Sequence, residues 1–301
     1  MRHLQTLRFI DAVARAKSIR KAAETLAITS TALNRRILAV EEELGVPIFE
    51  RLPGGVRLST AGEILLHHAR QQLSDMERVR SQIADLSGLR RGHVAIACSQ
   101  AMLPYFLPSQ IAAYCAEQPA VTFGVHRRDR EAAERALIDH DADLALVFEP
   151  VRLSEFQTLL TVRQPVHAVV APGHPLAGEG PVRLRDCLRF PVAVPTAEYG
   201  VRHLLEVALR KSSLDLTPAF ESDSFEFLMR LAATSSAVTF QIPIGVPAEM
   251  EAQGLSRPID TRDAPAGLLY MGQLRGRALP IAPARFADQI ALALTNRFEA
   301  A

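Results

Sequence analysis

Residues 18–51 read SIRKAAETLAITSTALNRRILAVEEELGVPIFER and place a run of small and basic residues directly before a stretch of hydroxyls, an amide and two arginines. Ser18 stands where a helix N-cap would stand, and the apolar spacing predicts a short helix over 19–26. Thr29 or Ser30 can cap the next helix in the same way. Two helices of this kind joined by a short turn are typical of a helix-turn-helix.

The segments on either side complete a small domain. Gly45 is expected to end the second helix in a left-handed conformation. The sequence PIFERLPGGVRLS over 47–59 indicates two short strands joined by a turn. We therefore expect a winged helix-turn-helix over 1–58. A helix before it is indicated by apolar residues at helical spacing: Leu4, Leu7, Ile10, Val13 and Ala14.

The second helix of a helix-turn-helix enters the major groove of DNA with its N-terminal turn against the base edges. Short side chains are needed there, because bulky ones hold the helix out of the groove, and Ser30, Thr31 and Asn34 meet this need. Asn34 can pair with an adenine edge in two places, and Arg35 and Arg36 supply positive charge. Singly, the hydroxyl residues are explained as helix caps and the arginines as a solvated face; the ordered combination favours a DNA reader.

Residues 59–88 form the next segment, which contains no proline and predicts one long helix. Apolar residues recur there at steps of four and three, which makes a heptad seam with one polar interruption. A narrow seam between charged faces favours a dimerising helix; the alternative is an amphipathic helix that lies on its own domain. The seam residues are Leu65, Ala69, Gln72, Met76, Val79, Ile83 and Leu86.

From residue 89 onward, short β-rich runs alternate with helical stretches. This alternation predicts an α/β domain in which parallel strands are joined by helical crossovers. Two chain crossings, near 161–164 and 265–268, would divide it into two α/β halves. Strands are expected at HVAIAC, VTFGVH, DLALVF, PVHAVVA, FPVAVP, SAVTFQIP and GLLYMGQL, and helices at 103–117, 129–139, 199–212, 224–233 and 283–299.

The composition is that of a soluble globular protein, with 48% hydrophobic and 22% charged residues among 301. Net charge is only +1, but residues 1–60 hold ten Lys and Arg against six Asp and Glu, which weakly favours a polyanionic partner. Neither a transmembrane run nor a signal peptide is evident, so we expect a cytoplasmic protein without a membrane partner. Reduced thiols are expected, with redox sensing as the alternative, at Cys98, Cys115 and Cys187.

The run AAETLAITSTALNRRILAVEEELGVPIFERLPGGVRLSTAG resembles the N-terminal domain of LysR-type transcriptional regulators. GHVAIACSQAMLPYFLPSQIAAYCAEQPAVTFGV looks like the start of that family's effector domain, and HDADLALVF and APGHPLAGEGPVRLRDCLRFPVAVP are similar to its later landmarks. The resemblance implies an α/β protein overall, with a winged helix-turn-helix over 1–58, a dimerising linker helix over 59–88 and a periplasmic-binding-protein-like effector domain over 89–301.

The resemblance also implies the function. Such a protein binds double-stranded DNA and regulates transcription, and a small-molecule effector in the C-terminal domain modulates its promoter binding or the bending of DNA. It would act as a homodimer or as a homotetramer made of dimers. The effector domain would consist of two subdomains, 89–162 plus 268–301 and 163–267.

Site residues follow from the same resemblance, position by position. It places the first turn of the second helix against bases and Arg51, in the wing region, against the DNA backbone. The chain departs from the family's usual pattern, which has Gln-Pro where Ser30 and Thr31 stand and Ser where Asn34 stands, so the bases that it reads are left open. The predicted DNA-binding residues are Ser18, Thr29, Ser30, Thr31, Asn34, Arg35, Arg36 and Arg51.

An effector is expected beyond the carboxyl ends of the strands, where loops and helix N-termini converge. N–H groups at helix starts suit a carboxylate, which is one candidate effector, although Glu149 would oppose an anion. Arg127 and Arg128 are more simply explained as a surface pair. The alternative for each loop residue is an ordinary cap or turn former. The predicted effector-binding residues are Ser99, Gln100, Ala101, Phe148, Thr196, Ser222, Ser224 and Gln241.

Catalysis is not expected, because the sequence contains no GxSxG, HExxH or phosphate-loop motif. His67 and His68 are adjacent, so they cannot share one helical face as metal ligands. We expect no catalytic residue, no metal site and no cofactor. Two other classes stay open: a solute-binding protein, against which the missing export signal counts, and an enzyme with a helical N-terminal appendage.

Overall fold

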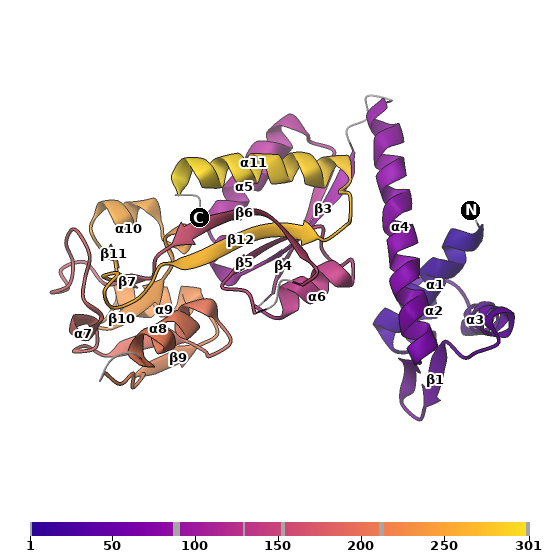
Figure 1. The fold of residues 1–301 in the computed structure, drawn as a ribbon, viewed down its shortest axis with the longest axis horizontal. Helices are drawn as coiled ribbons and strands as arrows, with labels where there is room; N and C mark the ends of the chain where they lie inside the picture. Colours follow the sequence, from indigo (N-terminus) through magenta and orange to yellow (C-terminus); the bar gives the residue numbers. More distant parts are fainter. Residues whose placement is uncertain (1, 87–90, 129, 152–153, 211–213, 299–301) are drawn as a thin grey trace. The chain divides into compact units, whose positions relative to one another are not determined.

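The computed structural model of the chain divides into two compact units, Met1–Ser87 and Gly88–Ala301. Figure 1 shows the helices and strands of each unit. The residues described are 2–86, 91–128, 130–151, 154–210 and 214–298.

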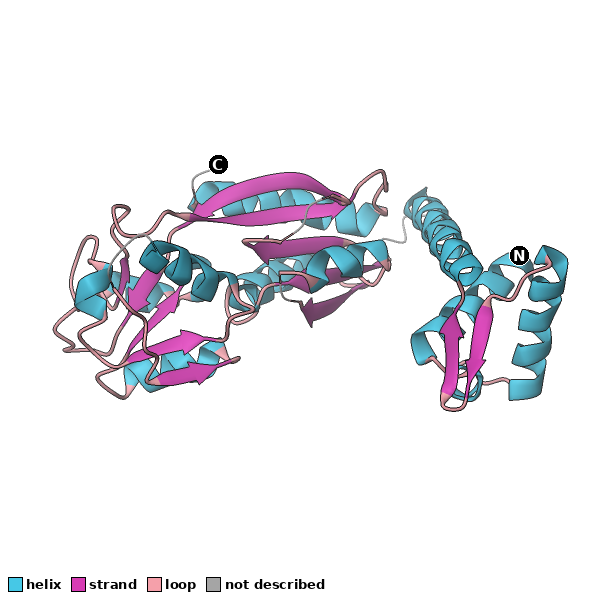
Figure 2. Cartoon of the chain, turned by 60° about the horizontal axis from the view of Figure 1, so that its bottom comes forward, coloured by secondary structure: helices cyan, strands magenta, loops and turns pink. Residues whose placement is uncertain are grey.

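The N-terminal unit contains, in its described residues, four helices and a two-stranded hairpin (Figure 2). The predicted caps are confirmed: Ser18 Oγ accepts a backbone N–H of α2 at 3.4 Å, and Thr29 Oγ1, rather than Ser30, accepts one of α3 at 3.2 Å. Gly45 ends α3 with a left-handed φ of 71°. The elements are α1 (Arg2–Ala16), α2 (Ile19–Thr25), α3 (Ser30–Leu44), β1 (Phe49–Leu52), β2 (Gly55–Leu58) and α4 (Thr60–Leu86).

A small apolar core holds these helices together. Ala22 and Ala23 are buried, and their small side chains let α2 approach α1 and α3 closely. Leu33 and Ile37 of α3 close the same core. Its buried members are Phe9, Ile10, Val13, Ala22, Ala23, Leu33, Ile37, Ile48, Phe49 and Leu66.

Helix α4 packs against α1 through the first half of the predicted seam. Ala69 is buried, and the adjacent Arg70 donates from Nε to Asp11 Oδ1 at 2.8 Å. Farther along the helix, Val79 and Ile83 are 40% and 59% exposed. The first half of α4 therefore lies on its own unit, which was the alternative reading, whereas the second half leaves apolar seam residues uncovered.

The second unit alternates strands and helices largely as predicted. Its described elements are β3 (Gly92–Cys98), η1 (Gln100–Met102), α5 (Phe106–Glu117), β4 (Val121–Arg127), α6 (Ala132–Ile138), β5 (Leu144–Phe148), β6 (Phe156–Gln164), β7 (His167–Val169), α7 (Leu184–Cys187), β8 (Val192–Pro195), α8 (Gly200–Arg210), β9 (Phe220–Ser222), α9 (Phe225–Ala233), β10 (Val238–Gln241), η2 (Pro243–Gly245), α10 (Ala248–Ala252), β11 (Ser256–Pro258), β12 (Gly267–Leu274) and α11 (Ile281–Arg297).

These strands form two five-stranded sheets, in the orders β4-β3-β5-β12-β6 and β11-β7-β10-β8-β9. Strand β3 is parallel to β4 and β5, but β12 is antiparallel to both β5 and β6, and β7 is antiparallel to β10. The prediction of parallel strands is therefore wrong for β7 and β12, and β6 was not predicted as a strand at all, because only a chain crossing was expected near 161–164. The reason is connectivity: β6 leads to the second sheet and β12 returns from it, so these neighbours run in opposite directions (Figure 1).

Helices cover both faces of the first sheet. Ile96 of β3 and Leu144 of β5 belong to the same core as Phe286 of α11. The alternate residues Ala97 and Ala145 belong to a second core with α6. The carboxyl ends of β3 and β5 are thereby held at a fixed edge, from which η1 begins.

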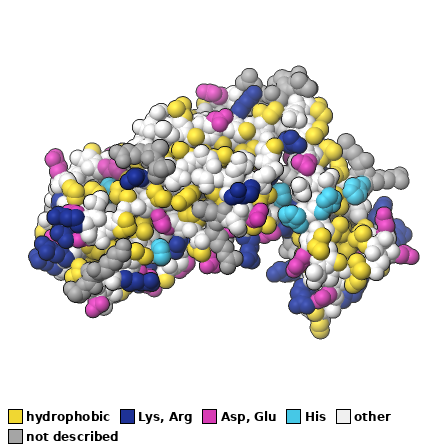
Figure 3. Space-filling view, in the orientation of Figure 1, with side chains coloured by type: hydrophobic (Ala, Val, Ile, Leu, Met, Phe, Trp, Pro, Cys, Tyr) yellow, Lys and Arg dark blue, Asp and Glu magenta, His cyan; other side chains and the backbone are white. Residues whose placement is uncertain are grey.

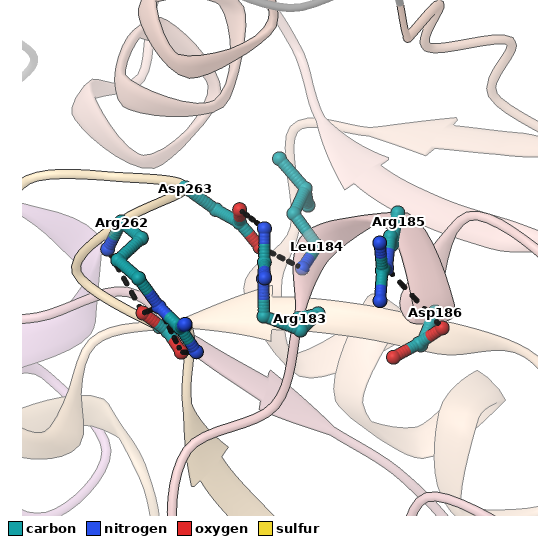
Figure 4. A network of polar contacts seen from close by, with 7 residues as sticks. Arg183, Leu184, Arg185, Asp186, Arg262 and Asp263 are labelled. Atoms are coloured by element: carbon teal, nitrogen blue, oxygen red, sulfur yellow. Dashed lines mark hydrogen bonds and ion pairs between the residues drawn. The ribbon is translucent and has the colours of Figure 1, made fainter.

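A polar network lies at the start of α7, in the part of the unit that carries the second sheet (Figure 4). Asp263 accepts two bonds from the Arg183 guanidinium, at 2.7 and 2.6 Å, and one from the Leu184 N–H at 2.8 Å. The bond from Arg183 holds the pKa of Asp263 below its ordinary value. Figure 3 shows Lys and Arg side chains gathered at the left end of the second unit, where Figure 1 labels α7. Carboxylates of this network offset part of that charge.

None of the helices in the described part of the chain combines the length and the apolar character needed to cross a membrane.

The tip of the β1–β2 hairpin is held against the end of α1. The Val56 N–H donates to the Lys17 carbonyl oxygen at 3.0 Å. At Gly55, where φ is 149°, an added Cβ would collide with that same oxygen. At the neighbouring Gly54, an added Cβ would have no atom within 4 Å. Of these two glycines, only Gly55 is therefore required by both its backbone conformation and the space around it.

Gly55→Ala is expected to destabilise the protein by about 2 kcal/mol or more, because the added Cβ forces the hairpin off Lys17 and strains the backbone. Gly54→Ala, its matched control, is expected to change stability by less than about 0.5 kcal/mol. Thermal unfolding followed by far-ultraviolet circular dichroism checks both. Equal unfolding curves for the two variants would contradict the contact between the hairpin and α1.

Candidate DNA-binding surface and effector cleft

Helix α3 presents a polar face to solvent because its apolar face is buried. Leu33 and Ile37 are 0% and 2% exposed, and these two positions fix the rotation of the helix on its core. Asn34 is partly buried beside the hairpin. The other four predicted residues of α3 are exposed: Ser30, Thr31, Arg35 and Arg36.

Ser18 and Thr29 act as helix caps. Each hydroxyl oxygen accepts a backbone N–H of the helix that follows, at 3.4 Å for Ser18 and 3.2 Å for Thr29. Capping satisfies groups that a helix start otherwise leaves without partners. Both residues thus position the helices of the predicted DNA-binding surface, and contact with DNA stays a prediction for both.

The hairpin is tied to α3 by Glu41. Its Oε1 atom accepts the N–H groups of Ile48 at 2.7 Å and of Phe49 at 3.0 Å. Two backbone donors on one carboxylate oxygen fix where β1 starts relative to the helix. Glu41 was not among the predicted site residues, since a glutamate in a run of three looks like a solvated face.

Strand alternation sends neighbouring side chains of β1 to opposite faces. Glu50 pairs with Arg57 across the hairpin, with Nη2 and Oε2 2.5 Å apart, and this hydrogen bond raises the pKa of Arg57. Arg51 points the other way and donates from Nη2 to Asn34 Oδ1 at 2.8 Å. Two predicted DNA-binding residues, Asn34 and Arg51, are therefore bonded to each other.

A cleft in the second unit brings together four predicted effector-binding residues. Ser99, Gln100 and Ala101 follow β3, and Phe148 ends β5. The cleft is nearly filled by its own side chains, with a free volume of about 10 Å³, room for about one water molecule, so a larger ligand requires it to widen. Its other described lining residues are Arg128, Arg130, Tyr199, Gly200, Val201, Phe225 and Ile242.

Gln100 spans this cleft from the first sheet to the start of α9. Its Oε1 atom accepts the Phe225 N–H at 2.5 Å, and its Nε2 atom donates to the Asp223 carbonyl at 3.1 Å. Tyr199 donates from its hydroxyl to the same Asp223 carbonyl, also at 3.1 Å. One side chain thus joins the parts of the second unit that carry the two sheets.

The charges that line the cleft are positive. Arg128 and Arg130 both lie in its wall, so Arg128 is not part of a surface pair as the sequence suggested. Burial lowers the pKa of Arg130. The Glu149 carboxylate accepts the Leu268 N–H at 2.7 Å and keeps its negative charge, which acts on Arg130, so its opposition to an anion stays a prediction.

Four predicted effector residues are outside the described lining of the cleft. Ser224 caps α9, accepting a backbone N–H at 3.3 Å, and Ser222 accepts the Ser224 N–H at 3.1 Å. Gln241 is 2% exposed and bonds the backbone of the next residue. The Thr196 hydroxyl oxygen is buried and has no hydrogen-bond partner among the described residues. The two serines therefore act as a helix cap and a turn former, which was the alternative to an effector-binding role.

Seven of the described lining residues were absent from the predicted effector-binding set, among them Tyr199, Phe225 and Arg130. Tyr199 and Phe225 pack with ring centroids 5.1 Å apart and form the apolar wall. Each lies within three positions of a predicted effector residue, Tyr199 after Thr196 and Phe225 after Ser224, which was the available signal. Arg130 lies in the charged run VHRRDRE, where nothing in the sequence separates an inward arginine from outward ones.

The cysteines have the properties of structural thiols. Cys98 and Cys187 are fully buried, and burial raises the pKa of each to about 12, so neither is a thiolate near neutral pH. Cys115 is partly buried. Over the described residues, no cluster of His, Cys, Asp and Glu side chains could hold a metal ion.

Comparison with known families matches both units. The model described as "Bacterial regulatory helix-turn-helix protein, lysR family" matches residues 4–63, and "LysR substrate binding domain" matches residues 87–294. A RuBisCO operon transcriptional regulator of Allochromatium vinosum is 32% identical over 67% of this chain and 67% of its own. The transcriptional regulator CbbR of Sinorhizobium medicae is 31% identical over 71% of this chain and 68% of its own.

Solved structures share the fold. A full-length OxyR variant from Pseudomonas aeruginosa has a TM-score of 0.72 at 20% identity, covering 96% of this chain and 94% of its own. Full-length BenM has a TM-score of 0.55 at 19% identity, covering 98% of this chain and 97% of its own. With both domain models matched in order, the chain belongs to the LysR family: it is a DNA-binding transcription regulator with an effector-binding domain, and not an enzyme.

Proposed function

We propose that this regulator responds to a small anionic effector of the carboxylate class, bound in the cleft described above. The observation that carries the proposal is the presence of Arg128 and Arg130 in the cleft wall. The nearby carboxylate of Glu149 accepts a backbone N–H and offsets part of the Arg130 charge, which leaves Arg128 as the main cation of the wall. A carboxylate between two guanidinium groups forms charge-assisted hydrogen bonds, which are stronger than neutral ones.

The rest of the wall supports a ligand with a small apolar body. Gly200 and Val201, the first residues of α8, line the cleft, and the N-terminus of a helix favours negative charge. Apolar surface comes from Phe148, Tyr199 and Phe225. An acid with one short hydrocarbon portion matches the chemistry of both parts of this wall once the cleft widens to admit it.

Gln100 supplies the link between ligand and conformation. Its amide joins the first sheet to the start of α9, so a ligand that fills the cleft competes with those two bonds. The ligand shifts the equilibrium only to the extent that it binds one arrangement better than the other. The effector would alter promoter binding or DNA bending by breaking or keeping the hydrogen bonds of Gln100 to Asp223 and Phe225.

We infer the domain limits and assembly from the same chain. A winged helix-turn-helix over 1–58 and a linker helix over 59–88 precede an effector domain over 89–301. Exposed Val79 and Ile83 suit pairing of two linker helices, and two such dimers would form a tetramer. A regulator of bacterial promoters would act in the cytoplasm.

The surface proposed to bind double-stranded DNA is the exposed face of α3 with the hairpin. Arg35 and Arg36 are its cations on the helix, and Arg51 is its cation on β1. RuBisCO operons are named for two relatives at 32% and 28% identity, whereas an uncharacterized Escherichia coli regulator, YbhD, also reaches 28%. The operon that this chain controls is therefore left out of the proposal.

A panel of small carboxylic acids and their uncharged amides, tested by thermal shift on the full chain, checks the effector class. An acid at a hundredfold excess over its Kd is expected to stabilise the protein by about 2.7 kcal/mol. Arg128→Gln is expected to abolish this shift, whereas Arg189→Gln, a control at an exposed arginine of the same unit outside the described lining of the cleft, is expected to retain it. Equal stabilisation by acids and amides would refute the anionic class.

Arg35→Ala is expected to weaken binding to duplex DNA from upstream of the gene, because it removes a phosphate contact. The slope of log K against log salt should become shallower by about 0.9. Fluorescence anisotropy at several salt concentrations measures both effects. Arg189→Ala, which removes an exposed arginine from the second unit, is the control and should leave the slope unchanged. An unchanged slope for Arg35→Ala would remove that residue from the interface.

A further inference from the structure

The bond between Arg51 and Asn34 has a chemical consequence for base recognition. A guanidinium has five N–H donors and no acceptor, so only the oxygen of the Asn34 amide can face it. The NH₂ group of Asn34 is attached to the same carbon and therefore points away from Arg51. The orientation of the amide is thus dictated by its partner.

The surrounding contacts fix Arg51 at this position. Glu41 holds the start of β1 through two N–H bonds, and Lys17 holds the tip of the hairpin. Glu50, the preceding residue of β1, faces away and pairs with Arg57. Among these charged side chains of the hairpin, Arg51 is the one that reaches α3.

We propose that Arg51 is a specificity-determining residue: it turns the Asn34 amide into a hydrogen-bond donor, so that the pair reads guanine rather than adenine. The inference rests on the proposed insertion of α3 into the major groove. It reverses the expectation from sequence, in which a free Asn34 pairs with an adenine edge in two places.

The edges of the bases explain the reversal. Recognition of adenine by asparagine requires the amide oxygen to accept from N6 and the amide NH₂ to donate to N7. Arg51 occupies the oxygen and adds its own donors beside it, so an adenine N6 amino group would face donors. Guanine presents two acceptors in the major groove, N7 and O6, and matches a surface made only of donors.

A simpler role for Arg51 predicts a different result. If the residue only neutralises a phosphate, its removal weakens binding to every sequence by the same factor and makes the salt slope shallower. If it orients Asn34, its removal changes which base is preferred at one position. Base preference therefore separates the two roles where affinity alone does not.

The experiment begins with selection of the full chain on a library of randomised duplex DNA. The selected site is then made as four duplexes for each position, differing in one base pair, and binding is measured by anisotropy. The proteins compared are wild type, Arg51→Ala, Asn34→Ala, the double variant and Arg57→Ala. Arg57→Ala is the matched control, because it removes an arginine from the same hairpin on the opposite face. Melting temperatures confirm that each variant is folded.

Wild type is expected to prefer guanine at one position by about tenfold over adenine, the size of one to two net hydrogen bonds. Arg51→Ala should move that preference to adenine, since the amide oxygen becomes available. Asn34→Ala should reduce discrimination at the same position, and the double variant should lose less than the two single losses combined. Arg57→Ala should leave all base preferences unchanged.

Two outcomes overturn the proposal. One is a wild-type preference for adenine at the position that Asn34→Ala affects. The other is an Arg51→Ala variant that binds all four duplexes weaker by one common factor. A third outcome bears on the proposed DNA-binding surface as well. If neither Asn34→Ala nor Arg51→Ala changes binding to any DNA, α3 does not contact the bases, and both the proposed surface and the role of Arg51 in specificity are wrong.

Discussion

Burial of one face of α3 is the constraint on which the DNA-binding unit depends. Leu33, Ile37 and Glu41 follow one another at intervals of four residues and so lie on one side of the helix. The first two close the apolar core, and the third binds two backbone N–H groups of the hairpin. The rotation of α3 about its own axis is thereby fixed, by the core near its start and by the hairpin farther along. This rotation decides what each outward-facing residue of the helix contacts. Asn34, next to the buried line, meets the hairpin; Arg35 meets solvent.

Local features of this unit were predictable from sequence because they depend on neighbouring residues. Caps at Ser18 and Thr29, the end of α3 at Gly45 and the hairpin turn each need only a few consecutive residues, and the structure confirms them. The bond between Arg51 and Asn34 was not predictable, because it joins residues 17 positions apart through the placement of a strand.

The effector domain divides in the same way. Alternation of strands and helices was visible, but strand direction was not, since hydrophobic pattern does not distinguish a parallel from an antiparallel neighbour for β12. Short elements such as α7, β9, α10 and β11 were missed because three to five residues carry too little periodicity. The cleft was predicted where loops follow β3 and β5, whereas its arginines were not, because side-chain direction in a charged loop is set by tertiary contacts.

The two halves of the protein solve related problems by different means. The DNA-binding unit holds its polar side chains on a helix whose rotation is fixed, so recognition is largely preorganised. In the effector domain, Gln100 reaches across to another part of the fold, and its bonds to Asp223 and Phe225 depend on the relative placement of two sheets. A rigid reader and an adjustable sensor are what a regulator requires if a small molecule is to alter binding without altering the bases that are read.

In the proposed mechanism, the position of Gln100 also sets the effector concentration at which the sensor responds. Two bonds of about 1 kcal/mol each must be given up before a ligand occupies the start of α9, which weakens its apparent affinity by about 30-fold. Traces of a metabolite would then leave transcription unchanged, and only accumulation would trigger a response. The Gln100 side chain would in this way raise the effector concentration needed for a response. A substitution that changes its length or polarity would change that concentration while the rest of the cleft stays the same.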